Sequence, residues 1–173
     1  LASRRIDGAI FDHGAQFITA RTPRFAALIE DCRRAGVVEE WYRTSEEGSP
    51  TQLRYRGHPG MSAIAKHLAR DIEVMLDTRV VALRAAPDRW IAECENGRLC
   101  SARAVVMTPP VPQSLSILRA GGVELEPTLH AQLAGMQYER CLAVLATLAA
   151  PSHLPVAGGI APQGGPIAWL ADN

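Results

Sequence analysis

The residues from Phe11 to Phe17 combine small and polar side chains within a run that otherwise favours a strand. Gly14 and Ala15 would let the backbone approach a flat ligand closely, because neither side chain fills that space. His13 and Gln16 supply hydrogen-bond donors and acceptors at the same place. The alternative interpretation is a bulge or barrel corner with a satisfied core histidine, which the pattern alone favours.

Two further segments carry groups that could face a ligand. The apolar stretch 104–107 predicts a strand, and the proline-rich turn and helix start at 108–113 follow it directly. Such a strand end is a common ligand edge in α/β proteins, and a rigid connector is an equally good alternative. The adjacent Arg4 and Arg5 could clamp an anion through bidentate hydrogen bonds, although such a pair is more often a solvated terminus.

No catalytic signature of a familiar kind is present in the chain. It has neither a Gly-x-Gly-x-x-Gly turn nor a Gly-x4-Gly-Lys-Ser/Thr loop to cradle phosphates. It also lacks a His-Glu-x-x-His helix and a Gly-x-Ser-x-Gly elbow. None of its four cysteines forms a Cys-x-x-Cys pair, so the sequence indicates no zinc or redox motif. We therefore expect no catalytic side chain and no metal site.

Composition is that of one ordinary globular domain, with 173 residues of which 47% are hydrophobic. Eighteen basic and 18 acidic residues give zero net charge, and without a basic face we expect no nucleic-acid partner. No apolar stretch approaches the roughly 20 residues that cross a bilayer, and no secretory signal opens the chain. We expect no membrane association and a cytoplasmic location.

Local signals predict four helices and a larger number of short strands. Thr22 is expected to cap a helix that starts at Pro23 and stops at Gly36. Ser62 and Thr128 are expected to cap two others, and the remaining one starts at Pro112. The predicted strands are 10–19, 53–57, 71–76, 79–83, 90–94, 99–102, 104–107, 141–148 and 167–170, with a polar surface loop at 45–51. This order predicts an α+β fold with a mixed, largely antiparallel sheet and a few packed helices.

The Asn96-Gly97 dipeptide predicts a two-residue hairpin turn. In that register Cys94 opposes Leu99, and Cys100 opposes Glu93. The two thiols would then lie on opposite faces of the ribbon, because side chains alternate along a strand. No disulfide is expected there.

Five collinear segments resemble the renalases and their bacterial relatives, which belong to the flavin-containing amine oxidase superfamily. Residues 12–17, followed by Thr19-Ala20-Arg21, are similar to the family's Asp-x-Gly-Ala-Gln-aromatic stretch. The other four segments are Ser3-Arg4-Arg5, residues 108–113, residues 138–143 and residues 167–173. Each match is short, and it is their common order along the chain that makes the resemblance specific.

This resemblance implies an FAD-dependent oxidoreductase that transfers a hydride from dihydronicotinamide isomers to flavin, with oxygen as the acceptor. Gly14 and Ala15 would lie against the flavin ring, with Gln16 on the substrate side. Val80 would meet the adenine, and Pro109 would lie where the substrate domain returns to the FAD domain. The cofactor-binding residues implied in this way are Arg4, Arg5, Gly14, Ala15, Gln16, Val80 and Pro109.

Family members also have a Rossmann unit and a second FAD-contacting segment, and neither is found in this sequence. We therefore expect residues 1–173 to be a single substrate-binding domain, with some cofactor-facing strands, of a longer flavoprotein. By themselves these residues should hold no FAD and be inactive, and the face that docks the FAD domain offers a route to a dimer. The alternatives are an amine oxidase or desaturase of the same superfamily and a non-catalytic binding domain.

Overall fold

The computed structural model describes residues 3–44, 52–154 and 158–172. The chain divides into two compact units, residues 1–73 with 142–173 (unit 1) and residues 74–141 (unit 2). The predicted loop at 45–51 lies outside the described residues. The elements are β1 (Ser3–Ile6), β2 (Ala9–Asp12), α1 (Pro23–Arg34), β3 (Val38–Thr44), β4 (Gln52–Gly57), α2 (Ser62–Leu68), β5 (Val80–Ala85), β6 (Trp90–Cys94), β7 (Leu99–Ala102), α3 (Val111–Ala120), α4 (Pro127–Ala134), β8 (Gly159–Ile160) and β9 (Leu170–Ala171).

The α+β class is confirmed, although the described strands form four small antiparallel sheets and no single large one. These sheets are β1-β2, β3-β4, β5-β6-β7 and β8-β9. The single-domain prediction stays a prediction. Among the described residues, none of the helices has the length and apolarity needed to span a membrane.

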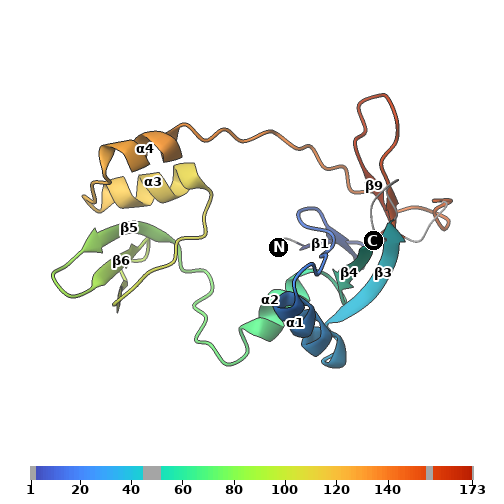
Figure 1. The fold of residues 1–173 in the computed structure, drawn as a ribbon, viewed down its shortest axis with the longest axis horizontal. Coiled ribbons are helices and arrows are strands. Elements are labelled where there is room, and N and C mark those ends of the chain that lie inside the picture. The colour runs from blue at the N-terminus through green and yellow to red at the C-terminus, as the bar shows by residue number, and fades with distance from the viewer. Residues whose placement is uncertain (1–2, 45–51, 155–157, 173) are drawn as a thin grey trace. The chain divides into compact units, whose positions relative to one another are not determined.

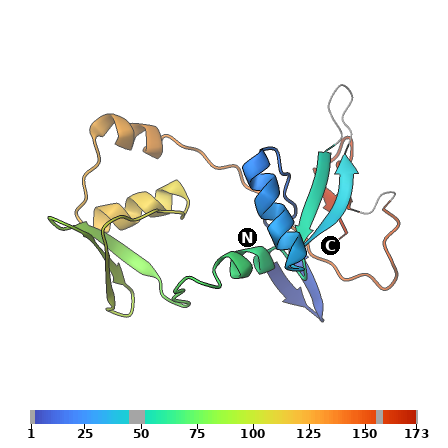
Figure 2. The ribbon, with the colours of Figure 1, turned by 60° about the horizontal axis from the view of Figure 1, so that its bottom comes forward.

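Helix α1 forms as its sequence predicts and supplies much of the core of unit 1. The Thr22 hydroxyl accepts from the Phe25 amide at 3.3 Å, and Gly36 has a φ of +72° just beyond the helix. Ile29 and Cys32 are buried together with residues of the neighbouring elements, namely Val38, Met61 and Ile64. Figure 2 shows α1 lying alongside the β3-β4 ribbon.

The β3-β4 ribbon presents two different faces. Its register shifts between Glu40 and Tyr42, so that Tyr42 pairs with Arg54. On one face Tyr55 packs against the α1 core, and its backbone also bridges to Ile18. Arg54 precedes Tyr55 in β4, so it lies on the opposite face with Tyr42.

Asp12 joins the β1-β2 hairpin to the start of α2. Its side chain is only 5% exposed, and its Oδ2 accepts from the Met61 amide at 2.9 Å. The Ser3 hydroxyl donates to its other oxygen. Met61, and not Ser62, is the N-cap residue, and no side chain of the helix caps it. The prediction of a Ser62 cap is wrong because Ser62 is already the first residue of the helix, and Asp12 binds the amide of the N-cap residue instead.

Unit 2 is a three-stranded meander covered by two helices. Figure 1 shows α3 lying between α4 and the β5-β6 strands. The approach of α3 to β5 is close, since a Cβ added at Gly121 would come within 1.9 Å of the Leu83 carbonyl oxygen. Glycine is therefore required at this position by space.

Two other local predictions in unit 2 are wrong. Glu126, and not Thr128, caps α4, and its carboxylate accepts from the Thr128 and Leu129 amides at 2.9 Å each. These bonds hold the pKa of Glu126 below its ordinary value. The β6-β7 register is one residue away from that expected, because the Cys94 amide donates to the Arg98 carbonyl and closes a longer loop.

This shifted register changes the relation of two cysteines. Ala92, and not Glu93, pairs with Cys100. Cys94 is two residues from Ala92, so Cys94 and Cys100 share a face, contrary to the prediction. Both thiols are free, and burial raises the pKa of Cys94, with Cys100 adding to the shift.

Several apolar segments predicted as strands are not paired among the described residues. Segments 71–76, 104–107 and 141–148 contain no strand. Ile72 is 66% exposed, Val106 is 88% exposed and Leu142 is 96% exposed. Apolar sequence favours a strand only where a second strand completes its hydrogen bonds. The strand predicted at 10–19 stops at Asp12 for the same reason, and that at 167–170 is reduced to β9.

Candidate functional site

The Gln16 side chain is held by a residue from the far end of the sequence. The Trp169 indole nitrogen donates to Gln16 Oε1 at 2.6 Å, although the two residues are 153 positions apart. Both side chains are half-buried. Gln16 follows directly on the exposed residues Gly14 and Ala15, so this bond anchors the end of the small-residue segment.

Four aromatic rings, those of Phe17, Trp41, Tyr42 and Trp169, form what we call the aromatic cluster. The Phe17 centroid lies 6.5 Å from that of Trp41, 6.4 Å from Tyr42 and 6.2 Å from Trp169. Trp41 and Tyr42 meet edge to face at 4.9 Å. Burial raises the pKa of the Tyr42 hydroxyl, which stays protonated at neutral pH.

Two consecutive glycines make room for the cluster. A Cβ at Gly158 would come within 2.2 Å of the Tyr42 ring, and one at Gly159 within 2.3 Å of the Trp169 ring. Gly159 also belongs to β8, which pairs with β9 directly after Trp169. The short β8-β9 ladder therefore seats the Trp169 indole beside Gln16.

Two arginines cover ring faces of the cluster. The Arg54 guanidinium lies 4.6 Å from the Phe17 centroid, and its Nη1 donates to the Thr19 hydroxyl. The Arg56 guanidinium lies 5.8 Å from the Trp41 centroid, and its Nε donates to Glu39 at 2.7 Å. Within the described ranges no carboxylate pairs with Arg54, whereas Arg56 is neutralised. Two guanidinium groups therefore lie over ring faces of the cluster, and that of Arg56 is paired with Glu39.

The structure gathers only part of the predicted site. Arg4 and Arg5 are exposed on β1, whereas Gly14, Ala15 and Gln16 follow β2 in the same unit. His13 is exposed, so the alternative of a satisfied core histidine is wrong.

The other two predicted contacts belong to unit 2. Val80 begins β5, and Pro109 is exposed shortly before α3. The FAD contacts assigned to all seven residues stay predictions.

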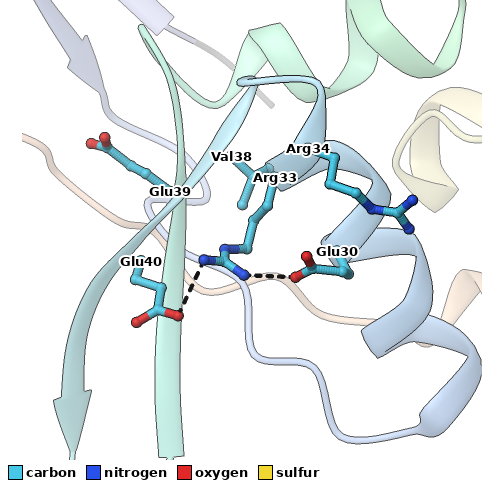
Figure 3. Close-up of a pocket in the computed structure, with 6 residues that line it drawn as sticks. All are labelled: Glu30, Arg33, Arg34, Val38, Glu39 and Glu40. Atoms are coloured by element: carbon cyan, nitrogen blue, oxygen red, sulfur yellow. Dashed lines mark hydrogen bonds and ion pairs between the residues drawn. The ribbon is translucent and has the colours of Figure 1, made fainter.

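A separate surface hollow of about 400 Å³ lies beside α1 and β3 (Figure 3). Arg33 dominates it, and its guanidinium reaches Glu30 at 2.6 Å and Glu40 at 3.6 Å. These exposed pairs connect the helix to the strand. No set of three or more His, Cys, Asp or Glu residues in the described part of the chain could hold a metal ion.

Reasoning from sequence missed the aromatic partners and arginines of Gln16. The alternation of Arg54 and Arg56 with apolar residues indicated a strand, but not what its polar face covers. Trp169 lies within a segment that was predicted as a strand at 167–170 and that also resembles a renalase segment, and neither observation gives its indole a partner. No local signal pairs Gln16 with a residue so far along the chain.

The sequence also matches a known protein family. The family model for flavin containing amine oxidoreductases matches residues 35–152, which is more than half of the chain. The matched range includes Trp41, Tyr42 and Arg54 of the site, and Gln16 and Trp169 flank it. The chain therefore belongs to the flavin-containing amine oxidoreductase family.

Proposed function

We propose that this chain forms the substrate-side wall of a renalase-like enzyme that oxidises dihydronicotinamide isomers. Membership of the flavin-containing family supports the flavin dependence of the intact protein. The observation that carries the finer proposal is the aromatic cluster around Gln16, in which guanidinium groups already cover two of the ring faces.

The residues present fit the ring end of a flavin. Gly14 and Ala15 are exposed, so their backbone is open to a flat ring, and Gln16 stands at the edge of that segment. Arg4, Arg5, Val80 and Pro109 are the further contacts that the proposal assigns to the cofactor. When bound, the flavin supplies the hydride acceptor and passes the electrons on to oxygen.

The charge of the site favours an anionic substrate over an amine. An amine substrate is a cation at neutral pH and would bind to the ring faces through cation–π contacts. Arg54 and Arg56 occupy two such faces, and the charge of Arg54 would oppose a further cation. A dihydronicotinamide dinucleotide carries phosphates, so Arg54 would attract it.

The part played by this chain is therefore binding and orientation. The cluster excludes water from one side of the substrate, and Gln16 offers an oriented amide. Hydride transfer from carbon requires no strong side-chain acid or base, so the site works by positioning alone.

Amine oxidation is the second candidate, because a cluster of aromatic rings can also bind an alkylammonium group on its ring faces. It requires Arg54 and Arg56 to leave ring faces that they cover in this structure.

The deciding experiment measures peroxide formation by the full-length, flavin-loaded enzyme on isomeric dihydronicotinamide dinucleotides and on simple amines. We expect turnover of the dinucleotides, and a KM raised about tenfold by Arg54→Met through loss of one charge contact. Arg43→Met is the matched control, since Arg43 pairs with Leu53 on the other ribbon face. Turnover of amines alone would establish the second candidate, and turnover of neither would refute both.

The predicted inability of residues 1–173 to hold FAD by themselves is tested separately by gel filtration with added FAD. A stoichiometric flavin band eluting with the protein would contradict it.

A further inference from the structure

The bond between Trp169 and Gln16 determines which way the Gln16 amide points. The indole nitrogen can only donate, so only the carbonyl oxygen of Gln16 can face it. The two-fold ambiguity that usually attends a glutamine side chain is thus removed by the chemistry of its partner. The amide nitrogen of Gln16 must point away from Trp169.

This nitrogen is open to a ligand. No hydrogen bond to Gln16 Nε2 is formed by the residues that the structure describes. In that same part of the chain, the buried side-chain polar atom without a partner is Arg54 Nε and not Gln16 Nε2. The Gln16 nitrogen is therefore not completely buried, and it carries two N–H donors next to the exposed Gly14-Ala15 segment.

Trp169 is itself prevented from turning away. Its ring lies against the backbone of Gly159 so closely that a Cβ there would come within 2.3 Å. Phe17 contacts it from another side, at a centroid separation of 6.2 Å. The donor that orients Gln16 is consequently a rigid one.

We propose that Trp169 is a positioning residue that locks Gln16 as a hydrogen-bond donor, and that the site therefore selects substrates by a carbonyl-type acceptor. This inference rests on the proposed function, in which the carboxamide oxygen of a dihydronicotinamide is the acceptor. Without the indole N–H, the Gln16 amide would rotate and present its oxygen to that acceptor part of the time. Two oxygen lone pairs would then face each other, and binding would weaken.

Three variants of the full-length, flavin-loaded enzyme separate this role from packing. Trp169→Phe keeps the aromatic contact but removes the donor, and we expect it to raise KM about twofold to threefold with little change in kcat, because a freely rotating amide presents its nitrogen about half of the time. Gln16→Glu keeps an oxygen for the indole but replaces the outward donor, and we expect it to raise KM at least about tenfold. Gln16→Leu removes both the oxygen that accepts from the indole and the outward N–H donor.

A double-mutant cycle then gives the decisive comparison. In the Gln16→Leu background, Trp169→Phe should change KM no further, because its effect passes through Gln16. Equal effects in both backgrounds would show that Trp169 acts through packing and would overturn the proposal. Trp90→Phe, in unit 2, is the matched control and should leave KM unchanged.

A readout that needs no substrate distinguishes this inference from the proposed function. In the ¹H–¹⁵N spectrum, the Trp169 indole resonance should move upfield in Gln16→Leu and stay shifted downfield in Gln16→Glu. An indole resonance indifferent to Gln16→Leu would refute the lock, whatever the substrate. A wild-type enzyme that ignores dihydronicotinamides would instead refute the proposed function. If the indole resonance shows that Trp169 holds residue 16 but Gln16→Glu leaves KM unchanged, the proposal that Gln16 recognises a carbonyl-type acceptor on the substrate is refuted.

Discussion

Replacement of Asp12 by alanine should destabilise unit 1, although Asp12 lies in the segment that resembles a flavin motif. Its buried carboxylate serves two donors at once, the Met61 amide at 2.9 Å and the Ser3 hydroxyl. The carboxylate thereby connects the β1-β2 hairpin to the first turn of α2. We therefore assign Asp12 a structural role.

The size of the destabilisation depends on whether each donor finds another partner once the carboxylate is gone. Hydrogen bonds to a charged group contribute roughly 1.5–3 kcal/mol, and a stranded buried donor costs roughly 1–3 kcal/mol. Met61 is fully buried, so its amide cannot turn to water, whereas the half-buried Ser3 hydroxyl can rotate. Asp12→Ala should therefore lower the free energy of unfolding by about 2–4 kcal/mol.

Asp12→Asn makes the prediction sharper. Its oxygen can still accept from the Met61 amide, and its NH₂ can donate to the Ser3 oxygen, so it should cost about 1 kcal/mol or less. Urea denaturation measures both values, with Asp71→Ala as the control because Asp71 is exposed. The reasoning is refuted if Asp12→Ala lies within about 0.5 kcal/mol of the wild type, or if asparagine costs as much as alanine.

Two further predictions concern the packing of α3 and the burial of α1. Gly121→Ala should destabilise unit 2 by about 1–3 kcal/mol, because its Cβ would meet the Leu83 carbonyl at 1.9 Å. Gly135→Ala is the control, because Gly135 has an ordinary φ of −76° and its added Cβ would come no closer than 3.3 Å to the Ala131 carbonyl oxygen, so a larger loss of stability in urea for this variant would contradict the steric argument. Burial raises the pKa of Cys32 above its ordinary value of 9.0, helped by the neighbouring Asp31 charge. The folded state then keeps the thiol proton where the unfolded chain releases it, so this contribution to stability is present below pH 9.0 and is lost as the pH rises toward the folded pKa. Urea denaturation at about pH 8 and about pH 10 measures this effect. Between these two values the free energy of unfolding should fall more for the wild type than for Cys32→Ala, and an equal fall in both proteins would contradict the raised pKa of Cys32.

Signals between near neighbours in the chain were sufficient for several elements. Thr22 and Gly36 bound α1 as predicted, because both the cap and the left-handed residue act within one helical turn. The caps predicted at Ser62 and Thr128 failed for a related reason. A suitable hydroxyl is only one candidate acceptor: the Glu126 carboxylate accepts from the first amides of α4, and Ser62 lies inside α2 behind the N-cap residue Met61.

Strand prediction failed where apolar residues had no partner. Segments 104–107 and 141–148 have the composition of buried strands, yet Val106 and Leu142 are almost fully exposed. A helix completes its hydrogen bonds internally, whereas a strand depends on another segment that local sequence does not specify. This difference explains why the helices were predicted better than the strands.

In the candidate site, too, some features follow from local sequence and others from distant partners. The sequence by itself determined that residues 13–16 carry small and polar side chains, since this follows from residue type alone. Only the tertiary structure decided that Trp169 holds the Gln16 carbonyl and that Arg54 covers Phe17. The physical reason is that an amide can point either way until a partner with a single hydrogen-bonding role fixes it, and here that partner lies 153 residues away.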